Sequence, residues 1–158
     1  MGRTIIVYGK SGSGKSRSLK GFARDEIFLV NVTGKDLPFR DGFLYTFISD
    51  NVPAIVKSMQ NMTNPQWPDS VKTVVIDDAG YLMTNAFMRG HSAPKKGASS
   101  FDLYNDIADS FFQLITAVKG LPPDVNVYLM MHEETSDYGE TKLRTIGKLL
   151  DQKVCIEG

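Results

Sequence analysis

Cysteine and long apolar runs are both scarce in this sequence. Cys155 is the only cysteine among 158 residues, so no disulfide can form within one chain, and the composition fits a reducing compartment. No stretch reaches the roughly 20 apolar residues of a membrane-spanning helix, and the first residues lack the apolar core of a signal peptide. We therefore expect a cytoplasmic protein without a membrane partner.

An excess of charge of one sign is also lacking. The 18 Lys and Arg residues equal the 18 Asp and Glu residues in number, so no global field attracts nucleic acid or an acidic membrane. A polyanion site other than a nucleotide site must therefore be a local patch. There is no internal repeat, heptad pattern or low-complexity tract, and the length predicts a single domain over residues 1–158.

A glycine-rich loop near the N-terminus follows an apolar run, residues 4–8, and precedes an amphipathic segment, residues 17–23. Strand, glycine-rich loop and helix are the context in which this pattern binds phosphate, because glycines let successive amides turn inward and the helix adds its positive end. Lys15 would reach the β- and γ-phosphates of ATP, and the Ser16 hydroxyl would bind Mg²⁺. The predicted nucleotide-binding residues are Gly9, Ser11, Gly12, Ser13, Gly14, Lys15, Ser16 and Arg17. The alternative is a glycine-rich turn that contains Lys-Ser by chance.

An apolar strand over residues 71–78 ends in two acids, Asp77 and Asp78. Such a strand delivers carboxylates to the C-terminal edge of a sheet, beside the phosphate loop. We assign Asp77 to Mg²⁺, directly or through water, and Asp78 to the base that polarises the attacking water. The alternative is that Asp78 only caps a helix over residues 80–88.

Two further residues are candidates for catalysis. A buried strand over residues 126–131 is predicted to deliver His132 to the same edge, where it would sense the γ-phosphate or the attacking water. A polar segment, residues 133–141, precedes Arg144, which could act as an arginine finger in cis or across a subunit interface. The alternatives are a structural histidine and a solvated charge.

A basic loop is predicted at residues 89–100, where apolar periodicity is absent. Its cations, Arg89, Lys95 and Lys96, suit contacts with the phosphates of single-stranded DNA; an ordinary solvated loop is the alternative.

A helix over residues 101–119 follows, with Ser100 as its expected N-cap. An earlier helix, capped by Asp50 or Asn51, is expected to run to about residue 62.

Several segments together resemble a phage family, the minimal RecA-core ATPases that act as ATP-dependent single-strand annealing recombinases, also known as phage AAA-type nucleotide-binding proteins. The resemblance covers nearly the whole chain, and it is carried by residues 9–16, the acids Asp77 and Asp78, and segments 35–39, 132–134 and 145–151. It implies that Lys15 and Ser16 bind ATP and Mg²⁺, that Asp77 is the metal acid, and that His132 opens a loop like the DNA-binding loop of RecA. It also implies single-stranded DNA and a homo-oligomer as partners, in the host cytoplasm if a phage encodes the chain.

Two features depart from that family. RecA carries its catalytic glutamate at an earlier strand end, whereas residues 31–33 here offer no acid, which leaves Asp78 as base or implies slow hydrolysis. The segment after His132 is acidic, which is poor for binding a phosphate backbone. The chain also stops where a strand over residues 154–156 is predicted to begin, so one interpretation is a C-terminally truncated domain.

The expected fold class is an α/β P-loop NTPase, a RecA-like three-layer αβα sandwich with a mainly parallel sheet of about five strands, including residues 27–32 and 43–48. We predict that the strand over residues 126–131 lies between the strand of the phosphate loop and the strand that ends in Asp77. The leading functional hypothesis is an ATPase whose nucleotide state governs DNA binding and annealing. A small P-loop kinase and an ATP-switched replication or packaging adaptor are the alternatives.

Overall fold

The fold is built on one sheet, seen in a computed structural model that describes residues 1–93, 97 and 99–146. Five parallel strands lie in the order β1-β5-β4-β2-β3, and β6 pairs antiparallel with β5. The segment after residue 125 therefore lies between the strands of the phosphate loop and of Asp77, as predicted. The strands are β1 Arg3–Gly9, β2 Ile27–Asn31, β3 Tyr45–Ile48, β4 Thr73–Asp77, β5 Asn126–Thr135 and β6 Thr141–Leu143.

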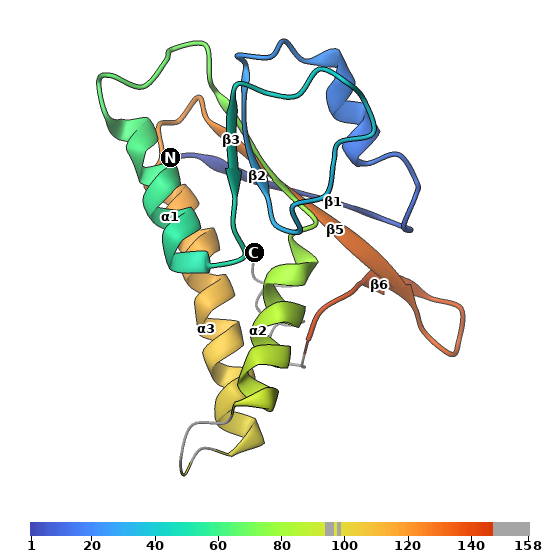
Figure 1. Ribbon diagram of the computed structural model, residues 1–158. Coiled ribbons are helices and arrows are strands. Elements are labelled where there is room, and N and C mark those ends of the chain that lie inside the picture. The colour runs from blue at the N-terminus through green and yellow to red at the C-terminus, as the bar shows by residue number, and fades with distance from the viewer. Residues whose placement is uncertain (94–96, 98, 147–158) are drawn as a thin grey trace.

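Three α-helices cover one face of the sheet: α1 (Val52–Gln60), α2 (Gly80–Ser92) and α3 (Ser100–Lys119). In Figure 1 they lie on one side of the strands, with α2 and α3 running next to each other. Successive strand residues point to opposite faces, so Val74 and Ile76 pack under the helices whereas Val75 packs on the other face. The predicted α/β class with a mainly parallel sheet is confirmed.

The second face has a thinner cover within the described residues. It consists of a short 3-10 helix, η1 (Ser16–Gly21), and the loop that follows β2, which bury Leu19 and Phe43 against Leu29, Val75 and Met130. The prediction of an amphipathic helix that continues to residue 23 was wrong. Only Leu19 of η1 is buried, so one apolar side chain anchors the segment, and the chain turns to an extended conformation at Phe22.

Several predicted boundaries also need correction. Asn51, one of the two predicted caps, does cap α1 by accepting a bond from the Ala54 amide, but α1 ends at Gln60. Ser99 rather than Ser100 caps α3, in a capping box with Asp102. Helix α2 continues to Ser92, so the predicted loop from residue 89 begins later. Strand β5 runs through Thr135, because its end forms an antiparallel pair with β6 that was not predicted.

Some predictions fall on residues 94–96, 98 and 147–158, outside the described residues. These are Lys95, Lys96, Cys155, most of the segment 145–151 and the strand over residues 154–156. Where the chain is described, no helix has both the length and the apolar character that crossing a bilayer requires.

Candidate functional site

The loop between β1 and η1 adopts the curved backbone that its glycines permit. Gly12 and Gly14 have φ angles of 76° and 93°, a left-handed region that costs glycine little and other residues more. The Ser13 amide donates to the Lys10 carbonyl at 3.2 Å, and the Ser18 amide donates to the Gly14 carbonyl at 2.9 Å. The loop is thus held at both ends.

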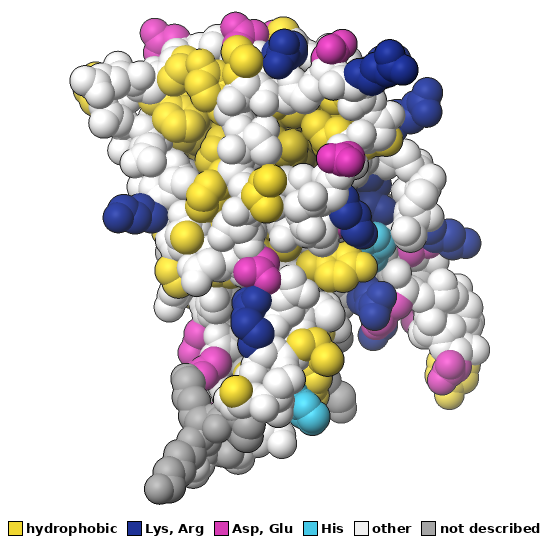
Figure 2. Space-filling view, viewed as in Figure 1, with side chains coloured by type: hydrophobic (Ala, Val, Ile, Leu, Met, Phe, Trp, Pro, Cys, Tyr) yellow, Lys and Arg dark blue, Asp and Glu magenta, His cyan; other side chains and the backbone are white. Residues whose placement is uncertain are grey.

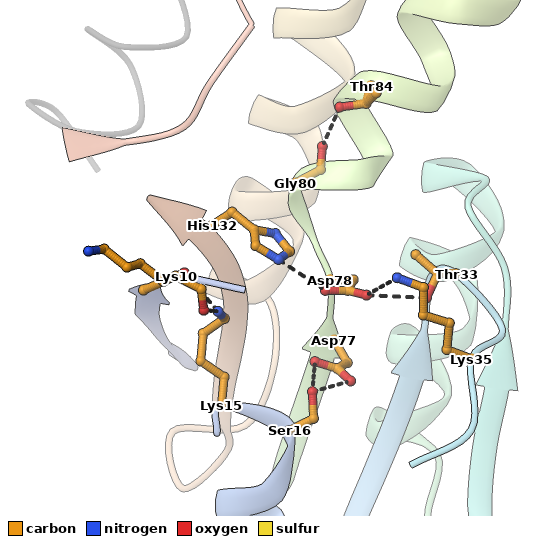
Figure 3. Close-up of polar contacts among 11 residues, drawn as sticks. Lys10, Lys15, Ser16, Thr33, Lys35, Asp77, Asp78, Gly80, Thr84 and His132 are labelled. Atoms are coloured by element: carbon orange, nitrogen blue, oxygen red, sulfur yellow. Dashed lines mark hydrogen bonds and ion pairs between the residues drawn. The ribbon is translucent and has the colours of Figure 1, made fainter. Parts of the chain in front are cut away.

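The Lys15 ammonium lies at the start of this loop. Its Nζ donates to the Gly9 and Lys10 carbonyl oxygens, each at 2.8 Å. Figure 3 shows that the side chain of Lys10, by contrast, points away from Lys15 and Asp77. Of these two lysines in the loop, only Lys15 is therefore held beside the backbone that would surround a phosphate.

Ser16 and Asp77 meet although 61 residues separate them in sequence. The Ser16 hydroxyl lies 3.0 Å and 2.9 Å from the two carboxylate oxygens of Asp77, at the end of β4 (Figure 3). A hydroxyl and a carboxylate are the hard oxygen ligands that suit Mg²⁺, which usually keeps several waters and takes further ligands from phosphate. The pair fits such an ion, and no cluster of three or more His, Cys, Asp or Glu residues that could hold a metal occurs in the described part of the chain.

Burial raises the pKa of the Asp77 carboxyl above its ordinary value, and the adjacent charge of Asp78 adds to the rise. The hydrogen bond from Ser16 and the charge of Lys15 act in the opposite direction. The ionised carboxylate is therefore held at a cost in free energy. A divalent cation at this position would favour the ionised form and offset that cost.

Asp78 faces a different set of partners. Its backbone has a φ of 58°, and its carboxylate accepts a hydrogen bond from Thr33 at 3.2 Å and lies 3.7 Å from Lys35 Nζ and 3.9 Å from His132 Nε2. Helix α2 has Ala79 at its N-cap, with no side-chain capping bond. The alternative interpretation of Asp78 as a simple helix cap was therefore wrong.

His132 lies within β5, opposite Gly9 of β1 in the parallel register, rather than just after the end of a strand. Its ring packs edge-to-face on Tyr81, with centroids 6.0 Å apart. The backbone amide of Arg144 donates to the His132 carbonyl at 2.9 Å. Arg144 and Ser11 line one cavity of about 270 Å³ with His132 and Tyr81, so the fold brings Arg144 to the phosphate loop.

Sequence reasoning missed three residues of this cluster: Thr33, Lys35 and Tyr81. Besides its contact with Asp78, Lys35 places its ammonium 5.4 Å from the centre of the Tyr81 ring. The register pairs Asn31 with Asp77, so residues just after β2 must lie beside those just after β4. A correct strand order was the signal that could have identified Thr33 and Lys35.

Arg89, one of the residues assigned to DNA binding, is not brought to this site. Arg89 lies in the last turn of α2, where its Nη1 contacts Asp50 Oδ2 at 2.6 Å. Hydrogen bonds from Arg89 and then from Asn85 hold the pKa of Asp50 below its ordinary value. Arg89 is therefore part of an ion pair rather than of a basic loop, and Lys95 and Lys96 lie outside the described residues.

A search of curated proteins finds no match. The model of the AAA domain family matches residues 1–154, which include every element described above. A parallel sheet with helices and a glycine-rich loop after its first strand agrees with that match, and we conclude that this chain belongs to the AAA domain family.

Proposed function

We propose that this chain binds ATP with Mg²⁺ at the loop of residues 9–16 and hydrolyses it. The observation that carries the proposal is the contact of Ser16 with Asp77 at 2.9–3.0 Å, directly after Lys15 in the chain. This arrangement puts an ammonium, a hydroxyl and a carboxylate at one end of the sheet. Phosphoryl transfer depends mainly on positioning and on charge stabilisation, which these groups can provide.

Each residue has a stated task in this proposal. The loop amides and Lys15 bind the triphosphate, while Ser16 and Asp77 supply protein ligands to Mg²⁺, which neutralises phosphate charge when bound. Asp78 accepts the proton of the attacking water. Lys35 and His132, at 3.7 and 3.9 Å from the Asp78 carboxylate, orient that carboxylate. Arg144 is proposed to contact the transferred phosphoryl group.

We also propose that ATP turnover is coupled to single-stranded DNA, in an oligomer of this chain that anneals strands in recombination. The support is the resemblance of the phosphate loop, the acids after β4 and segments 35–39 and 132–134 to phage annealing ATPases. Membership of the AAA domain family supports the nucleotide part alone. The two parts can therefore be tested separately.

Phosphate release from ATP tests the catalytic part. Lys15→Ala is expected to lower turnover roughly 100-fold or more, because it removes a charge directed at the transferred group. Lys10→Ala is the matched control, because it removes an equal charge from the same loop on a side chain that points away (Figure 3). Release without any acceptor supports an ATPase over a kinase. Equal turnover of wild type and Lys15→Ala would refute the proposed site.

A further inference from the structure

A second concave region lies beside the phosphate loop, on the thinly covered face. It is a cavity of about 580 Å³ between η1 and residues 38–41, within the roughly 300–1,000 Å³ typical of ligand pockets. Four cations line it together with two aromatic residues and a single carboxylate. These are Arg17, Lys20, Arg24, Arg40, Phe22, Phe39 and Asp41, and we call the region the basic pocket.

The charge of the basic pocket stands out against the rest of the chain. The whole sequence has a formal net charge of zero, whereas the cations that line the pocket outnumber its one carboxylate. In the part of the chain that the structure describes, none of these cations forms an ion pair. Figure 2 shows Lys and Arg side chains gathered at the upper right, where Figure 1 places η1. Uncompensated cations around one cavity indicate a ligand with several negative charges.

The aromatic side chains add a second kind of contact. Phe22 is 41% exposed, although burial of a phenyl ring is normally favourable. Phe39 is only partly buried, and its ring is held edge-to-face against Phe43, with centroids 6.0 Å apart. A fixed ring next to cations is the combination on which single-stranded nucleic acids stack their bases while their phosphates are neutralised.

We propose that the basic pocket is the binding site for single-stranded nucleic acid. The inference rests on the proposed function and gives its DNA part a location other than residues 89–96. Arg89 is occupied by Asp50, whereas Lys20 and Arg40 are exposed and have no ion-pair partner among the described residues. Arg17 follows Ser16 directly, so the strand and the nucleotide would contact one continuous segment, which gives ATP a route to influence strand binding.

The test removes two charges that hold no part of the fold together. The double variant Lys20→Gln, Arg40→Gln is compared with the double variant Lys57→Gln, Lys119→Gln. The second double variant removes two exposed charges from α1 and α3, on the opposite face of the sheet. Binding of a fluorescein-labelled oligothymidylate is followed by anisotropy over a salt series. For the pocket variant alone, counterion release predicts an affinity about 10- to 30-fold weaker at 0.1 M salt. The slope of the logarithm of affinity against the logarithm of salt concentration should also be smaller in magnitude by about 1.4.

Three outcomes would overturn the inference. If the pocket variant binds the oligonucleotide as tightly as wild type does, the basic pocket is not the binding site. The DNA part of the proposed function would still stand, because the wild type binds. A raised KM for ATP with unchanged oligonucleotide affinity assigns the pocket to the base of ATP instead. If the wild type binds no oligonucleotide with or without ATP, the DNA part of the proposed function fails too, whereas phosphate release still decides the ATPase part.

Discussion

Asp77 and Asp78 are neighbours in sequence, but their carboxylates meet different partners. Asp77 ends β4 and accepts from Ser16, whereas the φ of 58° at Asp78 turns the chain so that its carboxylate faces Thr33, Lys35 and His132. One backbone turn thus separates the proposed metal ligand, Asp77, from the proposed base, Asp78. The sequence pattern predicted the two acids, but only the turn explains why they can have different tasks.

The Asp78→Asn variant tests the base directly. Asparagine is among the residues that tolerate a left-handed conformation, so the fold should be retained at φ 58°. Loss of a general base is expected to lower turnover about 10²- to 10⁴-fold, with ATP affinity within about threefold of wild type. Single-turnover hydrolysis and equilibrium ATP binding measure the two quantities. Turnover equal to that of wild type would rule out Asp78 as the base.

The Asp77→Asn variant is expected to stabilise the nucleotide-free protein. Because burial raises the folded-state pKa of Asp77, the group favours the folded state when protonated, and this contribution is lost as pH rises through the folded pKa. At neutral pH the amide removes that cost, so the melting temperature should rise, by about 2–4 °C for each 1 kcal/mol of cost removed.

The pH dependence supplies the control for this prediction. The advantage of Asp77→Asn over wild type should shrink as pH falls, because wild-type Asp77 then becomes protonated as well. Asp69→Asn, at an exposed aspartate, should show no such advantage. A lower melting temperature for Asp77→Asn at neutral pH would contradict the assigned cost of burial.

At the scale of elements, the parallel strands were predictable, whereas the antiparallel strand β6 and the shortness of η1 were not. Strand β2 is buried at all five positions, and its continuous apolar run indicates a strand covered on both faces. Residues 133–135 are polar and exposed in part, yet they extend β5 because β6 pairs with them. That pairing is a tertiary contact that no local pattern contains. The short η1 buries a single side chain, Leu19.

A glycine of α2, Gly90, lies against the side chain of Leu103 in α3. A Cβ built on Gly90 would lie 2.2 Å from Leu103 Cδ1 and 3.2 Å from its Cγ, so Gly90→Ala must move the helices or the leucine. We expect a loss of about 1–2 kcal/mol in the free energy of unfolding, measured by urea denaturation.

Gly80→Ala is the matched control in the same helix. A Cβ at Gly80 meets nothing within 4 Å, and alanine has the higher helix propensity, so its stability should equal or exceed that of wild type. If Gly90→Ala were as stable as Gly80→Ala, the close approach of α2 and α3 would not be needed for the fold.

At the scale of the whole molecule, strand order is what assembles the site. Parallel β4 and β5 lie next to each other, and β5 also pairs with β1, so the loop after β1 and the acids at the end of β4 meet at one edge although they are far apart in sequence. The glycine-rich loop and the acids were recognisable because their residue types follow from phosphate and metal chemistry. Lys35 and Tyr81 were not, because their role depends on which strands are neighbours.

The surface chemistry was the least predictable feature at this scale. Composition placed the cations of residues 89–96 in a loop, but Arg89 belongs to a helix and pairs with Asp50. The cations of η1 and of residues 38–41 are dispersed in the sequence and gather only when the chain folds. The local charge pattern therefore misplaced Arg89, and the patch around η1 has no counterpart in any single stretch of the sequence.

Calorimetric titration of the wild-type chain with ATP, first with Mg²⁺ and then with EDTA, measures whether Ser16 and Asp77 take part in nucleotide binding. We expect one ATP per chain, binding at least about tenfold tighter with Mg²⁺, because Ser16 and Asp77 would hold an ion that also contacts the phosphates. In Asp77→Asn the difference between the two conditions should largely disappear. Wild-type binding that is absent, or equally tight in EDTA, would show that the proposed metal site is wrong.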